Sequence, residues 1–140
     1  MKVITWLAVL LLAAFFGVIA QVFVKKSVSL GRPSPEQTLA EVANEINKAT
    51  PRQIDKNTQL MSAVAIGKTL TYRYSLTNAS QKDYLKGSIE RLHGDKLKSS
   101  VCTSEGMRPL VKLGAVLEYE YHDKHGVVLD VISVETSKCQ

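Results

Sequence analysis

Three histidines are the side chains of this sequence whose type is most suited to binding a metal ion. His122 and His125 are separated by two residues and bracket a predicted turn, and His93 is the only other histidine. Zinc sites with this spacing usually lie on a helix or have further ligands close by. Because this pair lacks such neighbours, we interpret it as part of a solvated turn and predict no metal and no cofactor. A small metal-dependent enzyme that uses the three histidines is the alternative.

Two glutamates are the second candidate for chemistry. Glu118 and Glu120 lie on one face of a predicted strand, where paired carboxylates could act as a general acid and a general base. That role needs a pocket that separates the two pKa values, and no neighbouring motif indicates one. The sequence also has no Gly-x-Ser-x-Gly elbow and no glycine-rich phosphate loop. We therefore interpret the glutamates as the polar side of an edge strand and predict no catalytic residues.

Two cysteines, Cys102 and Cys139, are the only ones in the chain, and they lack the Cys-x-x-Cys spacing of redox and zinc sites. A buried free thiol does not suit Cys139, which is the penultimate residue, so we predict a disulfide between them. The bond would attach the C-terminus to the middle of the domain and stabilise it by about 4 kcal/mol. Disulfides persist in oxidising compartments, which favours an extracytoplasmic domain. Two separate buried thiols are the cytosolic alternative.

Four tyrosines occupy alternate positions of two predicted strands: Tyr72, Tyr74, Tyr119 and Tyr121. Alternation places each pair on one face of its strand, the face that points toward the predicted helices. They either pack in the core or line a surface that binds another protein, because tyrosine is enriched at protein interfaces. We favour packing in the core beneath the helices, and we name these four residues as the candidate binding surface if the alternative holds.

The N-terminal segment is strongly apolar, with no charged side chain from Val3 to Val24. A helix of this length would rise about 33 Å, enough to cross a hydrocarbon core of about 30 Å. We predict that residues 1–26 are a transmembrane anchor or uncleaved signal segment, with the lipid bilayer as a partner of Val3 to Val24. A signal peptide cleaved at Ala20 is the alternative.

The orientation of this segment is subject to two opposing signals. Lys25, Lys26 and Arg32 outnumber Lys2 and the terminal amine, so the positive-inside rule would place the domain in the cytoplasm. The predicted disulfide favours the opposite side. We expect a single-pass protein of the inner or cytoplasmic membrane with its domain outside the cytoplasm, or a periplasmic or secreted protein after cleavage.

The first half of the domain follows from capping signals and hydrophobic periodicity. After a tether over residues 27–33, Ser34 and Gln37 form a capping box that begins a helix with Pro35 at its first position, and Pro51 ends it. Strands over residues 59–66 and 69–77 flank the turn Gly67-Lys68.

The second half of the domain carries three further signals. Ser80 and Asp83 form another capping box, which predicts a helix with Leu85, Ile89 and Leu92 on its apolar face and an end near Gly94. Residues 96–113 are expected to form a helix broken around Gly106 and Pro109. Strands over residues 116–122 and 127–135 flank the turn at residues 123–126.

The predicted order is α-β-β-α-α-β-β over residues 34–140, an α+β fold with an antiparallel four-stranded sheet and helices on one face, after a single transmembrane helix. The net charge of +5 is spread along the chain without a basic stripe, so we predict no nucleic-acid partner. We expect a membrane-anchored, extracytoplasmic protein-binding or accessory domain whose partner is another envelope protein. An inhibitor or immunity protein acting through the loop at residues 123–126 is the alternative, and a carrier of a small apolar ligand is a further one.

Overall fold

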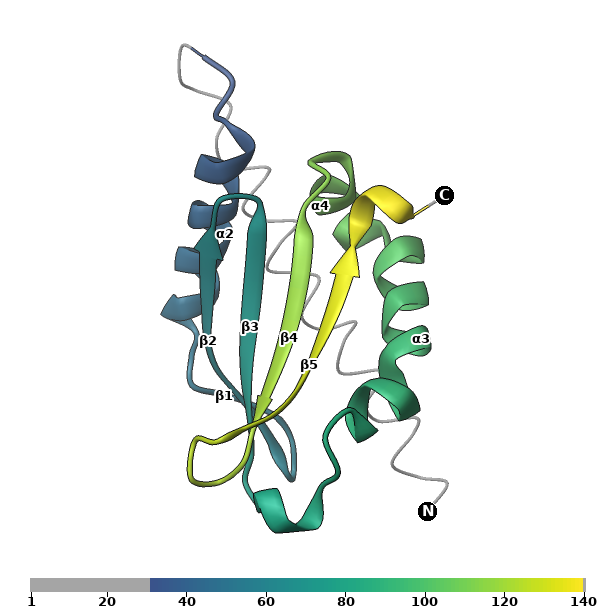
Figure 1. Ribbon diagram of the computed structural model, residues 1–140. Helices are drawn as coiled ribbons and strands as arrows, with labels where there is room; N and C mark the ends of the chain where they lie inside the picture. The colour runs from purple at the N-terminus through teal and green to yellow at the C-terminus, as the bar shows by residue number, and fades with distance from the viewer. Residues whose placement is uncertain (1–30, 140) are drawn as a thin grey trace.

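Five strands form one mixed sheet in the computed structural model, which describes residues 31–139 of the chain (Figure 1). Their order in the sheet is the order of the sequence: β1 (Arg52–Asp55), β2 (Thr58–Ile66), β3 (Thr69–Leu76), β4 (Val116–His122) and β5 (Val128–Glu135). Four of the five were predicted, and the two hairpins β2–β3 and β4–β5 are confirmed. The predicted α+β class is therefore confirmed, whereas the strand number is not.

The missed strand is β1, which pairs antiparallel with the first part of β2. It has four residues, Arg-Gln-Ile-Asp, of which only Ile54 is apolar. Hydrophobic alternation needs several apolar positions to be recognised, so a strand this short gives no signal in the sequence. Main-chain pairing with β2 forms it instead.

The sheet is mixed because β3 and β4 run parallel, which corrects the antiparallel prediction. The chain between them carries α3 (Ser88–Thr103) and α4 (Arg108–Lys112), and α3 returns the chain to the end of the sheet at which β3 begins (Figure 1). A crossover of this kind joins parallel neighbours, whereas a short turn joins antiparallel ones. The two hairpins therefore meet at a parallel pair in the middle of the sheet.

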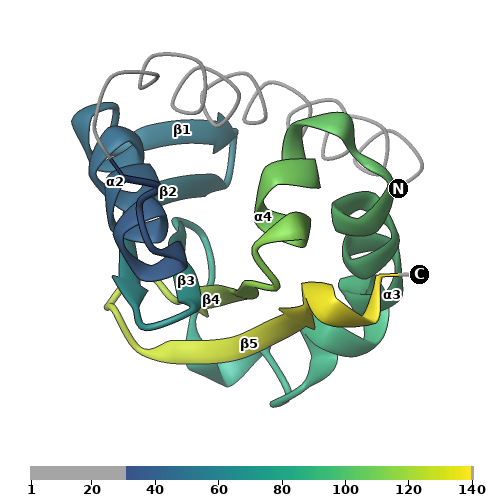
Figure 2. The ribbon, with the colours of Figure 1, turned by 90° about the horizontal axis from the view of Figure 1, so that it is seen from above.

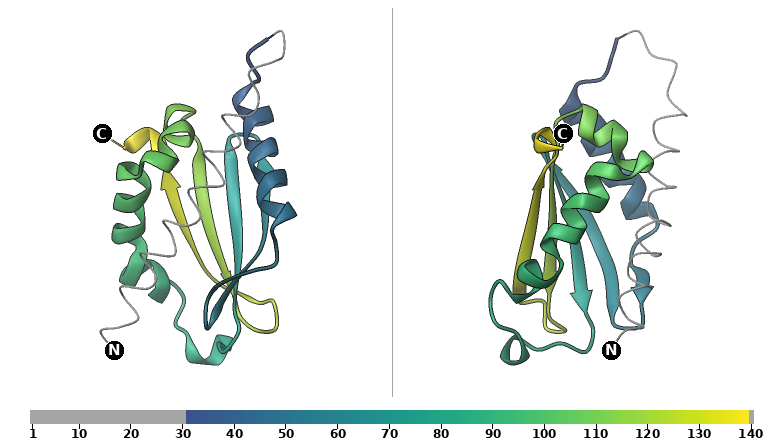
Figure 3. Two further views of the ribbon diagram at one scale, coloured as in Figure 1. Left: turned by 180° about the vertical axis from the view of Figure 1, so that it is seen from behind. Right: turned by 90° about the vertical axis from the view of Figure 1, so that its right-hand side faces the viewer.

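The helices lie on one face of the sheet, as predicted (Figure 3, right-hand view). α2 (Pro35–Lys48) packs mainly on β2, and α3 packs on β5, so the two helices flank the central strands (Figure 2). None of the helices in residues 31–139 is long and apolar enough to cross a membrane. The predicted segment at residues 1–26 lies outside the described residues, as does most of the tether.

Helix α2 begins where its sequence predicts. Ser34 accepts a hydrogen bond from the backbone N–H of Gln37, and the side chain of Gln37 accepts one from the backbone N–H of Ser34. Leu39, Val42, Ala43 and Ile46 recur at helical spacing and are buried against the sheet. Local capping and tertiary packing thus agree in this helix.

Helix α3 differs from its prediction at both ends. The capping box of Ser80 and Asp83 is present, but it caps only the 3-10 turn Gln81–Asp83. Gly87, with a φ of 78° in the left-handed region, then redirects the chain, and α3 begins at Ser88. It continues through Gly94 to Thr103, so the two predicted helices share one element, and α4 follows as a separate short helix.

The core lies between the helices and the inner face of the sheet. Buried residues of β2 to β5 and of α2 and α3 form it, and the partly buried Ile54 of β1 packs against it. Its most buried members are Leu39, Val42, Leu60, Leu70, Met107, Leu110, Leu117 and Ile132.

Candidate binding surfaces of the sheet

The four tyrosines proposed as a binding surface form a row on the inner face of the two central strands. The parallel register places Tyr72 of β3 beside Tyr119 of β4, and Tyr74 beside Tyr121. The ring centroids are 5.2 Å apart in the first pair and 5.4 Å in the second, and Tyr74 lies 6.4 Å from Tyr119. All three contacts are stacked, within the range in which aromatic pairs attract.

Burial limits what this tyrosine row can contact. Tyr72, Tyr74 and Tyr119 are 2%, 7% and 4% exposed, and Tyr121 is only half-buried. Burial raises the pKa of all four phenols, and that of Tyr121 rises to about 12 with a further contribution from Asp130. Three of the four predicted surface residues therefore pack in the core of this structure, and only Tyr121 reaches solvent.

The opposite face of the sheet is free of described helices, and we call it the open face. It carries the alternate residues of the same strands: Thr71 and Arg73 of β3, Glu118, Glu120 and His122 of β4, and Ser133 of β5. Arg73, Glu120 and Val131 lie side by side on neighbouring strands, and Thr71, Glu118 and Ser133 form the next row. This face is polar and partly exposed, as expected for the side of a sheet that meets water.

The charged groups of the open face are engaged with one another. Glu120 lies between Arg73, whose Nε is 3.4 Å from the carboxylate, and His122, which is within hydrogen-bond distance. Glu118 accepts a hydrogen bond of 3.1 Å from the Thr71 hydroxyl. Glu118 and Glu120 thus have separate partners and do not contact each other as an acid–base pair would. Their contacts with β3 stabilise the sheet.

The histidines do not assemble into a metal centre within residues 31–139, which contain no group of three side chains able to bind a metal ion. His122 contacts Glu120 through Nε2 and the Gly126 carbonyl through Nδ1. His125 is exposed in the turn, and His93 is exposed on α3.

Asp123 builds the turn between β4 and β5, a role that the sequence did not reveal. Its buried carboxylate accepts hydrogen bonds from the backbone N–H groups of Val127, His125 and Gln81. These bonds, that of Val127 first, hold the pKa of Asp123 below its usual range. The loop proposed as an inhibitor's contact is therefore fixed by an internal acceptor, and Gly126 supplies the left-handed residue with a φ of 82°.

Asp130 connects β5 to the start of α3. Its Oδ2 accepts hydrogen bonds of 3.0 Å from the backbone N–H groups of Ile89 and Glu90, and its Oδ1 accepts one of 3.1 Å from Val131. Carboxylates are favoured at helix N-termini because the first N–H groups lack partners within the helix. Gly87 has no side chain with which to cap α3, so a residue distant in the sequence provides the acceptor.

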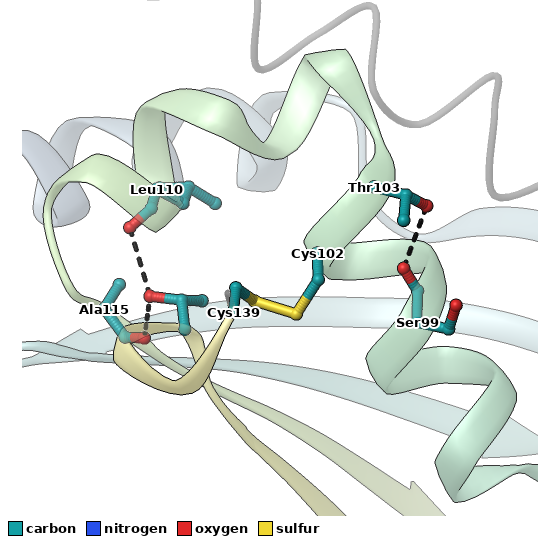
Figure 4. The surroundings of a disulfide bond; sticks show 7 residues. Ser99, Cys102, Thr103, Leu110, Ala115 and Cys139 are labelled. Carbon is teal, nitrogen blue, oxygen red and sulfur yellow. Dashed lines mark hydrogen bonds between the residues drawn. A yellow bond between two sulfur atoms is a disulfide. The ribbon is translucent and has the colours of Figure 1, made fainter.

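A disulfide joins Cys102 in the last turn of α3 to Cys139 after β5, as predicted (Figure 4). The two Cα atoms are 5.1 Å apart and 37 positions apart in the sequence. Close by, the Thr136 hydroxyl donates a bifurcated hydrogen bond, at 2.7 Å to the carbonyl of Ala115 and at 3.4 Å to that of Leu110. The C-terminal turn is therefore attached both to α3 and to the loop that precedes β4.

Three solved structures share this fold. A "putative secreted protein" from Pseudomonas aeruginosa is 23% identical with a TM-score of 0.62, and the match covers 79% of this chain and 100% of that chain. A pilotin of the Vibrio vulnificus type 2 secretion system is 14% identical with a TM-score of 0.57, covering 76% and 92% of the two chains. A type II secretion system pilotin from Vibrio cholerae is 15% identical with a TM-score of 0.55, covering 73% and 89%.

The sequence of the domain matches one protein family over its full length. No curated protein sequence matches this chain. Residues 28–140, however, match the model of a family described as "Putative quorum-sensing-regulated virulence factor". Since this match extends over the whole described domain, the chain belongs to that family.

Proposed function

We propose that this protein is an extracytoplasmic accessory protein that binds another envelope protein through the open face of its sheet and has no catalytic activity. The observation that carries the proposal is the open face itself, a sheet surface that no described helix covers. α2 and α3 both pack on the other side of the sheet, so the residues around Arg73 and Glu120 are available to a partner (Figure 3).

The polar groups support binding over catalysis. Asp123 and Asp130 are occupied with backbone N–H groups, and Glu120 with Arg73 and His122. A general acid or base needs access to a substrate and a pKa adjusted to its task. These carboxylates instead stabilise a turn, a helix start and the sheet, which leaves shape and charge as the properties that a partner would recognise.

The fold and the compartment support an envelope role. The two Vibrio structures with this fold are pilotins of type 2 secretion systems, and the Pseudomonas structure is described as a "putative secreted protein". The disulfide between Cys102 and Cys139 is of a kind that persists in an oxidising compartment. We further propose that the apolar run from Val3 to Val24 tethers the domain to the membrane, or directs its export if it is cleaved at Ala20.

Site-specific cross-linking in intact cells tests the binding proposal. A photoreactive amino acid at Ser62, which lies beside Arg73 on the open face, should yield one discrete adduct with an envelope protein. The same amino acid at Asn44, which is exposed on α2 on the other side of the domain, is the matched control and should not yield it. Identical adducts from both positions, or none from Ser62, would contradict the use of this face.

The topology is tested separately in sealed membrane vesicles. Protease added to the periplasmic side should degrade the domain, and a thiol reagent should label Cys102 and Cys139 only after reduction. Protection from protease, or labelling without reductant, would place the domain in the cytoplasm. The mass of the mature chain then distinguishes a retained N-terminal segment from cleavage at Ala20.

A further inference from the structure

The outer edge of β5 is the one long border of the sheet at which main-chain groups in the described residues remain unpaired. β5 is the last strand of the sheet, and only β4 pairs with it (Figure 1). An unpaired strand edge exposes alternating N–H and C=O groups to which another strand can bond. Proteins commonly block such edges against unwanted pairing, so an edge that is left open indicates a site where another strand can bind.

The direction of the β5 backbone groups follows from two hydrogen bonds. The N–H of Thr136 bonds to the carbonyl of Ala115, just before β4, so even-numbered residues of β5 point toward β4. The N–H of Val131 bonds instead to the Asp130 carboxylate, so odd-numbered residues point outward. Ser133 therefore directs its N–H and C=O groups away from the sheet, and Glu135 directs its N–H the same way, whereas the Glu135 carbonyl begins the 3-10 turn Thr136–Lys138.

The opposite border of the sheet is blocked at Ala63. β1 pairs only with the first part of β2, so the rest of β2 forms the border of the sheet there. The N–H and C=O of Ala63 point outward from this part of β2. The side-chain amide of Asn47, on α2, bonds to both, each at 2.8 Å. Asp130 blocks β5 in the same manner, but only at Val131. The edge from the Val131 carbonyl to the Glu135 N–H has no such block.

The side chains along this edge define the partner's chemistry. Val131 is 37% exposed, and Val128 before it is 48% exposed, which gives an apolar patch at the start of the edge. Glu118 lies opposite Ser133 on β4, and Glu135 follows with the Lys138 ammonium 3.0 Å from its carboxylate, so the far end carries two carboxylates and one ammonium group. A complementary strand would place an apolar β-branched residue beside Val131 and a basic residue near Glu135.

We propose that the β5 edge accepts an extended segment of a partner protein as a sixth strand, hydrogen-bonded to the main chain of Val131, Ser133 and Glu135. This inference rests on the proposed protein-binding function and adds the β5 edge, which borders the open face, as a second contact with its own binding mode. Main-chain bonds in strand addition supply affinity, and alternate side chains supply specificity. The partner segment need only be short, because the free edge itself is short.

Peptides that bind the protein are the probe for this proposal. They are selected from a random phage-display library, with the full disulfide-bonded chain in detergent as the target. Selected peptides should be extended, with a β-branched apolar residue and a basic residue on the same face. Ser133→Pro removes one outward N–H without touching the β4 ladder and should weaken peptide binding about tenfold. Ser133→Ala keeps the N–H and should bind as the wild type does.

A second measurement does not depend on the variant folding. N-methylation of the peptide at amides that face β5 should abolish binding, whereas methylation at the alternate amides should leave it intact. Equal binding to Ser133→Pro, or equal effects of the two methylation patterns, would overturn the proposal. So would a dimer of the wild-type chain that Ser133→Pro converts to a monomer, because a second copy would then occupy the edge. A retained adduct from Ser62 in any of these cases would leave the open-face function intact.

Discussion

Asp130 is the residue at which three parts of the domain meet: β5, the start of α3 and the half-buried end of the tyrosine row. Its carboxylate accepts three backbone N–H bonds, two of them from residues about forty positions earlier in the chain. Removing a buried acceptor leaves its donors without partners, which costs more than the bond itself contributes. Asp130 therefore specifies where α3 begins, a task that Gly87 cannot perform.

Asp130→Ala should lower the free energy of unfolding by about 1–3 kcal/mol, because the N–H groups of Ile89 and Glu90 lose their acceptor at the helix N-terminus. Urea unfolding at neutral pH measures the change. Asp83→Ala, which removes the acceptor of an exposed 3-10 turn, is the control and should cost less. Equal losses of stability in the two variants would contradict the role of Asp130 as the acceptor that fixes the start of α3.

Asp123 gives the domain a dependence on acidic pH. Its pKa is lowered in the folded state, so its ionised form stabilises the fold at any pH above the ordinary aspartate value of about 3.9. That contribution is lost as the pH falls below this value and through the lowered folded pKa. Asp123→Asn should flatten the fall in stability over this acidic range, measured by urea unfolding at a series of pH values. An unchanged slope would show that other carboxylates dominate.

At the scale of the elements, α3 shows how tertiary contacts override a local signal. Leu85, Ile89 and Leu92 form a convincing stripe in the sequence, yet Leu85 and Leu92 are 77% and 75% exposed. The helix starts later than its capping box predicts, and its buried side consists of Ile89, Gly94, Leu97 and Val101. A two-turn pattern does not determine which side of a helix a sheet will cover.

Substitutions on the two sides of α3 should therefore differ strongly. Leu97→Ala removes a side chain that is only 6% exposed and should lower the free energy of unfolding by about 2–5 kcal/mol. Leu92→Ala should change it by less than about 0.5 kcal/mol, because this leucine meets solvent. Thermal or urea unfolding of the two variants checks the contrast. A loss at Leu92 as large as that at Leu97 would contradict the packing described for this helix.

The sequence predicts the elements that carry their own signals. α2 has a capping box and a four-residue stripe, and both hairpins have turn glycines flanked by alternating strands, so their positions are correct. β1 and the parallel β3–β4 pair have no local signal, because each exists only through pairing with a distant strand. The same holds for the tyrosine row, whose members could be identified as inward-facing but whose stacking follows from the parallel register.

At the scale of the whole molecule, the disulfide closes the fold. It joins the end of α3 to the chain after β5, and so connects the crossover to the last hairpin. Cross-linking reduces the conformational freedom of the unfolded chain, an effect that grows with the length of the closed loop. The domain is small enough for one such bond to be a large share of its stability.

Reduction of the disulfide should lower the free energy of unfolding by about 4 kcal/mol, given a separation of 37 positions between the cysteines. Urea unfolding with and without reductant measures this difference. A chain carrying Cys102→Ser and Cys139→Ser should match the reduced wild type and should not respond to reductant. Equal stability of the oxidised and reduced wild type would show that the bond does not restrain the unfolded chain.

The disulfide also determines the route by which mechanical tension crosses the domain. A force applied at the C-terminus reaches Cys139 and passes to the end of α3, so it does not peel β5 from β4 one hydrogen bond at a time. Moving α3 requires its contacts with β5 and the bonds to Asp130 at its far end to break together. A pull on the C-terminus is therefore resisted by α3 as well as by the hydrogen bonds between β4 and β5.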